Sequence, residues 1–418
     1  MTGAVVTVQG AATLPPAEFG RLSAALAIYY FMLTAIRALV SEVYLVRFAG
    51  APDRVPPGVA RWAQVTTVRL SLVAAAVVLA AAAAAPLSTS SRLTLTALAA
   101  ALPLLLWQQV RRSVLLAAAR PARSAASSGL VLVGQVVGGL ALQATVGVSA
   151  PGLLFCWAAA GALAIRYMPV TERPAPVAGA VADRRQPRDG SLRWLAEGRA
   201  FWPRFLCQDM AQGGASQVAL LVVAGISGTV VVAGLRAALL LLAPLLVLQQ
   251  AAGYIALAEA TRLHPAHRLR FILVAQAGAV LAAAVWLVLL DLLPRTALEL
   301  VAGDNLAGGM SALPGMAVFI IASLLLSAPA AVLRSSGHVQ AGMTLGLALM
   351  PALIGIPALV AGRGGSVGEV AAGFGVFGLL AVVVWIPACV SVLRTRRGEP
   401  GAGPRPPGLA EPASAAGE

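Results

Sequence analysis

Long apolar runs recur along the whole chain, separated by short polar intervals. A helix needs about 20 mostly apolar residues to cross the hydrocarbon layer of a membrane. The runs lack the alternation that barrel strands require, and backbone groups must pair internally in lipid, so we expect an all-α membrane bundle. Eleven spans are predicted, near residues 22–47, 66–86, 93–115, 125–147, 150–168, 204–226, 229–257, 269–293, 311–333, 338–361 and 369–393.

The composition supports this class. Hydrophobic residues make up 59% of the 418 residues and charged residues 11%, and the mean hydropathy is +0.86. A soluble protein carries about 25% charged residues, and disordered chains are poor in apolar residues. The composition therefore excludes both classes and predicts a multi-pass membrane protein.

The arginines predict its orientation. All 30 basic residues are arginine, and a cytoplasmic loop at 48–65 would place 23 of them on the cytoplasmic side. Four lie on the other side: Arg21, Arg92, Arg295 and Arg363. Such a bias is the positive-inside signal. The net charge of +14 thus serves topology, and we expect no nucleic-acid partner. The three arginines left over, in or near spans, are Arg37, Arg69 and Arg236.

The N-terminus departs from this alternation, because eleven spans would leave it outside. The stretch Ala4–Leu14 is mildly apolar but too short to cross. It is either the end of a first helix whose start is missing from this chain, or the remnant of a helix that the protein has lost. No basic region precedes it, so we expect no cleavable signal peptide.

A long polar interval divides the chain into two lobes of about six helices each, residues 1–168 and 204–393. The interval 169–203 is a predicted cytoplasmic linker, and its end, 191–202, is either a short interfacial helix or an unstructured loop. Phe19–Leu22 and Ala233–Arg236 open similar helices 214 residues apart, which suggests a repeat. Residues 394–418 form a predicted disordered tail.

Polar residues recur inside two predicted spans. They are expected either to line an aqueous cavity or to pack against polar neighbours, because they cannot comfortably face lipid. Intervals of three and four align one set on a helical face, and a second set is spaced by four. The first set is Tyr30, Thr34, Arg37, Ser41 and Tyr44; the second is Gln208, Gln212 and Ser216.

Charged residues at membrane depth are further candidates. Glu42 lies about 140° around the helix from Arg37, so we expect the two not to pair. Asp209, like Glu42, is a candidate for ion coupling, or is neutralised by Arg204. Arg236 either meets an anionic ligand in the cavity or extends outward to the membrane surface.

Small residues suggest where helices pack closely: Gly134 and Gly138, and Gly373, Gly375 and Gly378. Enzymatic patterns are absent, because the three histidines lie in loops and no P-loop motif occurs. Cys156, Cys207 and Cys389 are far apart, which predicts neither disulfides nor a metal site. We therefore expect a protein that is not an enzyme and that needs no cofactor.

Three segments of the sequence resemble those of a known family. Residues 15–27, PPAEFGRLSAALA, are similar to the segment that joins the first two helices in bacterial polysaccharide-export flippases of the MOP exporter superfamily. Residues 228–238, GTVVVAGLRAA, continuing to Gln250, resemble the segment that opens its second lobe. Residues 111–123, RRSVLLAAARPAR, are similar to the basic loop after its fourth helix.

The resemblance implies twelve helices in two six-helix lobes around a cavity that opens to each side in turn. The implied activity is flipping of a polyprenyl-diphosphate-linked oligosaccharide across a bacterial cytoplasmic membrane. Implied partners are that lipid-linked glycan, membrane lipids, and a glycan polymerase or glycosyltransferases. The incomplete first helix departs from the family pattern. Arginines such as Arg37 and Arg236 would suit a diphosphate.

Two alternatives remain open. A cation-coupled small-molecule (multidrug) exporter of the same superfamily would use Asp209 or Glu42 for coupling. A membrane glycan polymerase or ligase would carry a large outer loop with catalytic residues. The longest predicted outer loop here, 293–310, is short, which argues against a polymerase or ligase.

Overall fold

The architecture comes from a computed structural model that describes residues 2–48, 58–118, 120–167, 194, 196, 198–199, 202–249, 252, 267–335 and 339–395. Every element in the described part of the chain is a helix, as the apolar runs predict. Most of the predicted linker 169–203 and of the predicted tail 394–418 falls outside these ranges.

The first lobe contains α1 to α7. Their bounds are α1 Thr2–Thr13, α2 Pro16–Ile36, the π-helical turn η1 Arg37–Ser41, α3 Glu42–Phe48, α4 Val59–Ala84, α5 Thr89–Ala117, α6 Pro121–Thr145 and α7 Ala150–Tyr167. The second lobe contains α9 Trp202–Asp209, the π-helical turn η3 Met210–Gly214, α10 Ala215–Ser227, α11 Thr229–Leu241, α13 Arg268–Leu292, α14 Arg295–Ala302, the short 3₁₀ turn η5 Gly303–Asn305, α15 Leu306–Ser335, α16 Val339–Gly362 and α17 Val367–Thr395.

Nine helices in the described ranges are long and apolar enough to cross a membrane. Residues Thr229–Leu241 and Ala243–Gln249 make a tenth if they are one span, bent by 66°. Pro244 explains the bend, since it lacks an N–H and clashes with the preceding turn of helix. The predicted interval 204–226 is divided between α9, η3 and the shorter apolar helix α10.

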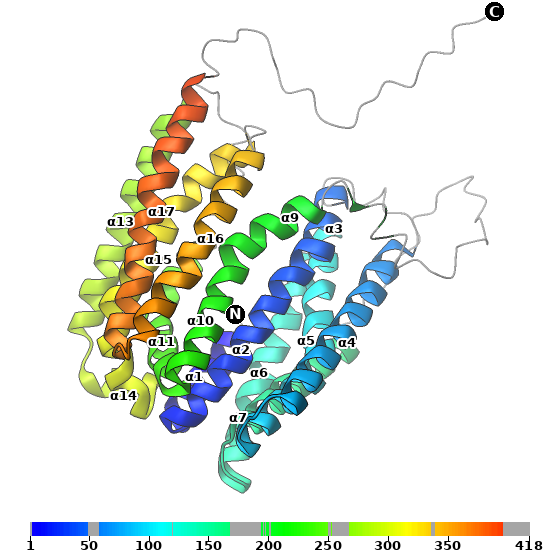
Figure 1. Ribbon diagram of the computed structural model, residues 1–418. Coiled ribbons are helices and arrows are strands. Elements are labelled where there is room, and N and C mark those ends of the chain that lie inside the picture. Colours follow the sequence, from blue (N-terminus) through cyan, green and yellow to red (C-terminus); the bar gives the residue numbers. More distant parts are fainter. Residues whose placement is uncertain are drawn as a thin grey trace, which may run out of the picture.

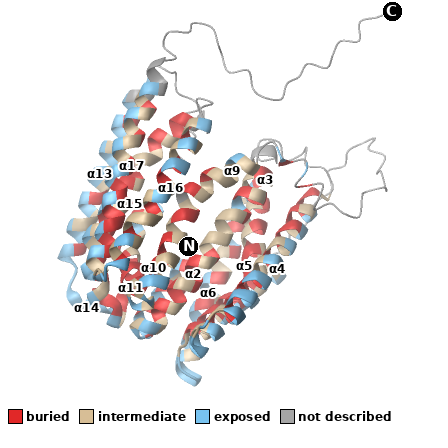
Figure 2. Cartoon of the chain, in the orientation of Figure 1, coloured by how far each residue is buried: buried red, intermediate tan, exposed pale blue. Residues whose placement is uncertain are grey.

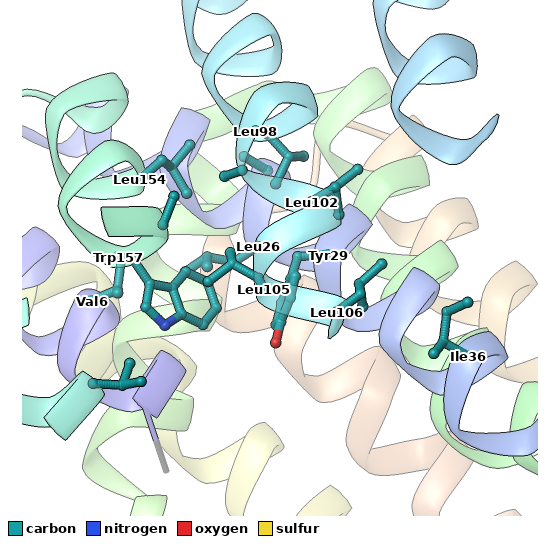
Figure 3. Packing of buried hydrophobic residues seen from close by; sticks show 14 of the residues in the cluster. Val6, Leu26, Tyr29, Ile36, Leu98, Leu102, Leu105, Leu106, Leu154 and Trp157 are labelled. Carbon is teal, nitrogen blue, oxygen red and sulfur yellow. The ribbon is translucent and has the colours of Figure 1, made fainter. Parts of the chain in front are cut away.

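Each lobe has its own apolar core. In the first, Leu98, Leu102 and Leu105 recur at helical spacing on α5 and face Tyr29 of α2 and Trp157 of α7 (Figure 3). The rings of Tyr29 and Trp157 meet edge to face, with centroids 4.6 Å apart. The second core is built from α10 to α17. The described residues thus form two main apolar cores.

Helices α2 and α11 form the seam between the lobes. Ala27 of α2 belongs to the core of the second lobe, while Ala233, Ala237 and Leu240 of α11 belong to the core of the first. Helix α10 also runs beside α2 along the middle of the molecule (Figure 1). Residues on these helices can therefore contact both lobes.

The outward faces of the bundle are apolar and exposed, as a lipid-facing surface requires. Helices α4 and α13 show this most clearly (Figure 2). Val73 on α4 is 63% exposed and Leu281 on α13 is 65% exposed. In water such faces would be an aggregation hazard. We therefore interpret these faces as the surface that contacts lipid.

The lobes are in contact at the end that the arginine pattern predicts to be outside. The Asn305 side-chain amide donates hydrogen bonds to the carbonyl oxygens of Ala11 and Leu14, at 3.0 and 3.2 Å, across the lobes. The Thr229 hydroxyl donates to the Ala17 carbonyl at 3.4 Å. Asn305 is 3% exposed, so this contact is shielded from water.

The lobes diverge at the opposite end. There α16 and α17 run away from α4 and α5 (Figure 1). The end of α3, the start of α9 and the end of α17 all lie at this end, whereas α14 lies at the other, in agreement with the predicted alternation. The molecule is thus joined on the predicted outer side and splayed on the predicted cytoplasmic side.

The sequence left open the structure of the N-terminal stretch and of the end of the linker, and the structure describes parts of both. Residues 2–13 form α1, and Val6 and Ala11 are fully buried in the first core. Trp194, from the predicted linker, is helical and 2% exposed. Its indole N–H donates to the Leu39 carbonyl at 3.4 Å. The end of the linker is therefore docked onto the first lobe through this residue.

Candidate substrate site between the lobes

The two sets of polar residues predicted from the sequence, called here the first and the second polar stripe, each contain a π-helical turn. The Glu42 N–H donates to the Arg37 carbonyl, and the Ala215 N–H donates to the Met210 carbonyl, each five residues back instead of four. An extra residue of this kind is rare in α-helices and frequently marks a functional site. The two turns lie along the seam: η3 packs against α2, and η1 packs against α9.

The π-turn overturns one prediction from the sequence. Arg37 and Glu42 were expected not to pair, but the Arg37 Nη2 and Glu42 Oε1 atoms are 3.7 Å apart. The 140° separation holds for a regular α-helix, whereas an i to i+5 turn brings residues five apart onto one side. Each of these charges therefore has a counterion within its own helix.

Arg236 and Tyr30 are brought together from the two lobes. The guanidinium carbon of Arg236, on α11, lies 5.4 Å from the centre of the Tyr30 ring on α2. Arg236 is only 8% exposed, and its Nε and Nη2 atoms have no hydrogen-bond partner. The sequence left open whether Arg236 extends outward to the membrane surface. Its burial excludes that alternative.

The charge of Arg236 is not compensated within the described residues. A buried guanidinium without a counterion costs several kcal/mol, and about 2.5–3.5 kcal/mol even on the permissive membrane-insertion scale. A cation–π contact returns about 0.5–2 kcal/mol. The contact with Tyr30 is therefore too weak to balance burial, and an anion is the natural complement of this site.

The other members of the first stripe have different surroundings. Thr34 lies opposite Gly213 of η3, and its hydroxyl donates to the Tyr30 carbonyl at 2.8 Å. Ser41 is 3% exposed, and its hydroxyl has no partner. Tyr44 stacks on Trp194, with ring centroids 6.1 Å apart. The extra residue of η1 rotates the positions after it, so Ser41 and Tyr44 leave the face of Tyr30 and Thr34.

The second stripe lies at the start of the second lobe. Gln208 is 4% exposed. The Ser216 hydroxyl donates to the Gly213 carbonyl at 2.8 Å, within its own helix. Asp209 is half-buried at the end of α9. The Gln212 side chain lies outside what the structure describes. Cavity lining by these residues, and ion coupling by Asp209 or Glu42, stay predictions.

Several residues of the seam and the first core carry no signal in the sequence alone. Arg112 was assigned to the cytoplasmic face, yet it lies within α5, and its Nε is buried. Asn305 and Trp194 stand in polar intervals, where burial is not expected. Their roles depend on partners almost 300 and 155 residues away, so no local pattern could reveal them.

Groups suited to a metal ion are absent from the described ranges: no three His, Cys, Asp or Glu residues cluster there. All three cysteines are free. A cavity of about 370 Å³ lies at the outer end of the second lobe, beside Asp291 and Arg295. It is lined by residues of α13, α14 and α15, and Tyr30 and Arg236 do not take part in it.

Comparisons with known proteins agree with this architecture. No protein-family model matches the chain, and no curated protein is significantly similar to it. Solved structures do match. An inward-facing multidrug resistance MATE family transporter of the MOP superfamily is 15% identical, with a TM-score of 0.66 over 94% of this chain and 95% of that one.

Two further structures show the same likeness. An outward-facing multidrug resistance MATE family transporter is 14% identical, with a TM-score of 0.57 over 95% of this chain and 92% of that one. A MOP superfamily transporter from Pyrococcus furiosus, described as having a binding pocket of reverse polarity, is 15% identical, with a TM-score of 0.54 over 95% of this chain and 97% of that one. The chain has the two-lobed fold of MATE transporters of the MOP superfamily.

Proposed function

We propose that this chain is a membrane transporter that exports small amphiphilic molecules carrying an anionic group, from a bacterial cytoplasmic membrane, by alternating access. The matching folds belong to multidrug resistance transporters and cover nearly the whole chain. The joined outer end and the splayed inner end suit an inward-facing state, and the higher TM-score of the inward-facing relative supports it.

The polarity of the substrate follows from Arg236. Its guanidinium lies at the seam, over Tyr30, with two unpartnered nitrogen atoms and no carboxylate beside it. Guanidinium groups bind carboxylates and phosphates through paired hydrogen bonds of fixed geometry. A cationic drug would be repelled by this uncompensated charge. We therefore expect an anionic group to bind between Arg236 and Tyr30.

Replacing Arg236 tests this proposal. Arg236→Gln removes the charge and keeps a polar side chain, so we expect uptake of carboxyfluorescein into inside-out vesicles to fall by about 10- to 100-fold, the equivalent of a charged hydrogen bond of 1.5–3 kcal/mol. Arg236→Lys should recover part of the rate, since lysine retains the charge but not the planar fork.

Arg363→Gln is the matched control, because Arg363 lies in the exposed turn between α16 and α17 and should leave uptake unchanged. Wild-type vesicles that accumulate ethidium but not carboxyfluorescein would refute the anionic substrate. Equal rates in the wild type and in Arg236→Gln would refute the assigned site.

A second candidate function is flipping of a polyprenyl-diphosphate-linked oligosaccharide. The uncompensated Arg236 favours it as well, because a diphosphate is a strongly anionic head group. Proteoliposomes with a fluorescent lipid-linked oligosaccharide distinguish the two. Movement of that lipid between leaflets, lost in Arg236→Gln, supports flipping, whereas carboxyfluorescein transport without lipid movement excludes it.

Asp209 is our candidate for coupling transport to an ion gradient. Asp209 is half-buried at the end of α9, directly before the π-helical turn η3. We expect Asp209→Asn to abolish the stimulation of uptake by an imposed proton or sodium gradient, while passive exchange persists. Glu42→Gln, the matched variant, should keep most of that stimulation. The reverse result would move the coupling site to Glu42.

A further inference from the structure

A second uncompensated arginine lies within the first lobe. Arg112 is on the inner part of α5, five residues before the helix ends at Ala117, or about 8 Å along the axis. Its Nη1 donates to the Gln109 side-chain oxygen at 3.1 Å, while its Nε is buried without a partner. No carboxylate contacts Arg112 in the described part of the chain.

Arg112 and its polar neighbour Gln108 lie on α5 beyond the leucines of the first apolar core. Leu98, Leu102 and Leu105 precede them on α5 at helical spacing and belong to the core of the first lobe. Gln108 is 4% exposed, and its amide nitrogen also lacks a partner. Residues four apart lie on one side of a helix, so the Gln108 and Arg112 donors share one side.

Arg111 does not share this situation. Its guanidinium lies 5.8 Å from the centre of the Trp107 ring, and the Trp107 indole N–H is held by the Gln64 side-chain oxygen at 3.0 Å. Arg111 thus has an aromatic platform on the side of α4. Arg111 is 9% exposed and Arg112 is half-buried, but Arg112 is the one that keeps a buried unpartnered donor.

Two neighbouring tyrosines connect Arg112 to the seam. Tyr29 of α2 lies close to Gln109 and Arg112 of α5. Tyr30, the next residue, lies under Arg236. The two tyrosine rings are 5.2 Å apart. Arg112 lies near the inner end of α5, and Arg236 lies within α11, nearer the middle of the molecule. The two cations are therefore at different depths along the membrane normal.

From this geometry we propose that Arg112, with Gln108 and Gln109, is a second anion-binding position that receives the phosphate-bearing head group of a substrate on its way from the cytoplasmic side to Arg236. The inference rests on the proposed transport of anions. The unpartnered donors are the Arg112 Nε and the Gln108 side-chain nitrogen, and a phosphate offers them three oxygens and a larger charge than a carboxylate does.

Binding to the purified full-length protein in nanodiscs tests this position. The probe is geranylgeranyl diphosphate, followed by tryptophan fluorescence. We expect Arg112→Gln to weaken binding at least 10-fold and Arg112→Lys to weaken it less than 3-fold. Arg363→Gln is the matched loss of an exposed positive charge and should bind as the wild type does.

A thermal readout separates binding from packing. Because Arg112 is half-buried, with a buried Nε and no carboxylate beside it among the described residues, Arg112→Gln should leave the melting temperature of the ligand-free protein unchanged or raise it. The rise in melting temperature caused by the diphosphate should be lost. A lower melting temperature of ligand-free Arg112→Gln, with equal weakening of binding in Arg112→Lys, would show a packing role and overturn the inference.

Competition identifies the source of the phosphate. Displacement by inorganic pyrophosphate indicates a free head group, displacement only by a second lipid diphosphate indicates a membrane-borne one, and displacement by neither overturns the site. Arg236→Gln separates the two proposals. If it weakens binding while Arg112→Gln does not, this inference fails and the proposed function stands; if only Arg112→Gln weakens binding, the assignment of Arg236 fails instead.

Discussion

Gly20→Ala is expected to open the outer end of the molecule. A Cβ atom at Gly20, on α2, would meet the Thr229 carbonyl oxygen of α11 at a distance that no atom pair tolerates, so the two helices must separate. Overpacking of this kind costs about 1–3 kcal/mol, which shifts a two-state equilibrium about 5- to 150-fold. Uptake should fall because the inward-facing state is the one that loses stability.

Thiol labelling measures this opening. Leu14 is 2% exposed and its carbonyl accepts a hydrogen bond from Asn305, so Leu14→Cys reports on the outer contact. With the three native cysteines replaced by serine, Gly20→Ala should raise the rate of reaction with a membrane-impermeant maleimide about 10-fold.

Gly225→Ala is the control for this prediction. Gly225 is also helical, but nothing lies within 4 Å of a Cβ placed there. Its labelling rate should equal that of the parent protein. Identical labelling in the Gly20 and Gly225 variants would show that the α2–α11 contact does not hold the outer end closed.

The global architecture could be read from the sequence because it depends on the solvent rather than on particular contacts. Lipid imposes a minimum length of apolar residues on each span, and the arginines mark the loops that stay inside. The spans 93–115 and 369–393 accordingly lie within α5 and α17. The close packing predicted at Gly134 and Gly138 is also confirmed, since Cβ atoms there would lie 2.9 Å from Ala160 and 3.0 Å from Cys156.

The candidate site was only partly predictable, because its geometry depends on two interruptions of helical periodicity. A period of 3.6 residues aligns Tyr30 with Thr34 correctly but fails beyond η1, where Arg37 turns toward Glu42. Nothing in the order of residues 37–41 distinguishes a π-turn from a regular turn. The partner of Tyr30 was also out of reach, since Arg236 comes from the other lobe.

The second lobe should depend most strongly on Gly315. A Cβ at this position of α15 would overlap the Ala371 carbonyl carbon and lie 2.5 Å from the Ala372 nitrogen, both backbone atoms of α17. Backbone cannot yield as a flexible side chain can, so Gly315→Ala must force apart two helices that pack along much of their length. We expect a loss of about 2–4 kcal/mol in stability.

Melting of the detergent-solubilised protein, followed by size-exclusion chromatography after heating, should show a decrease of roughly 2–5 °C for Gly315→Ala. Gly278→Ala on α13 introduces the same methyl group at an exposed position where nothing lies within 4 Å, and it should not lower the melting temperature. Small residues let membrane helices approach closely, and Gly375 of α17 would itself place a Cβ 3.1 Å from the Gly315 carbonyl oxygen. Equal melting of the two variants would mean that α15 and α17 tolerate a wider separation than this backbone contact implies, and that the rigidity of the second lobe has another origin.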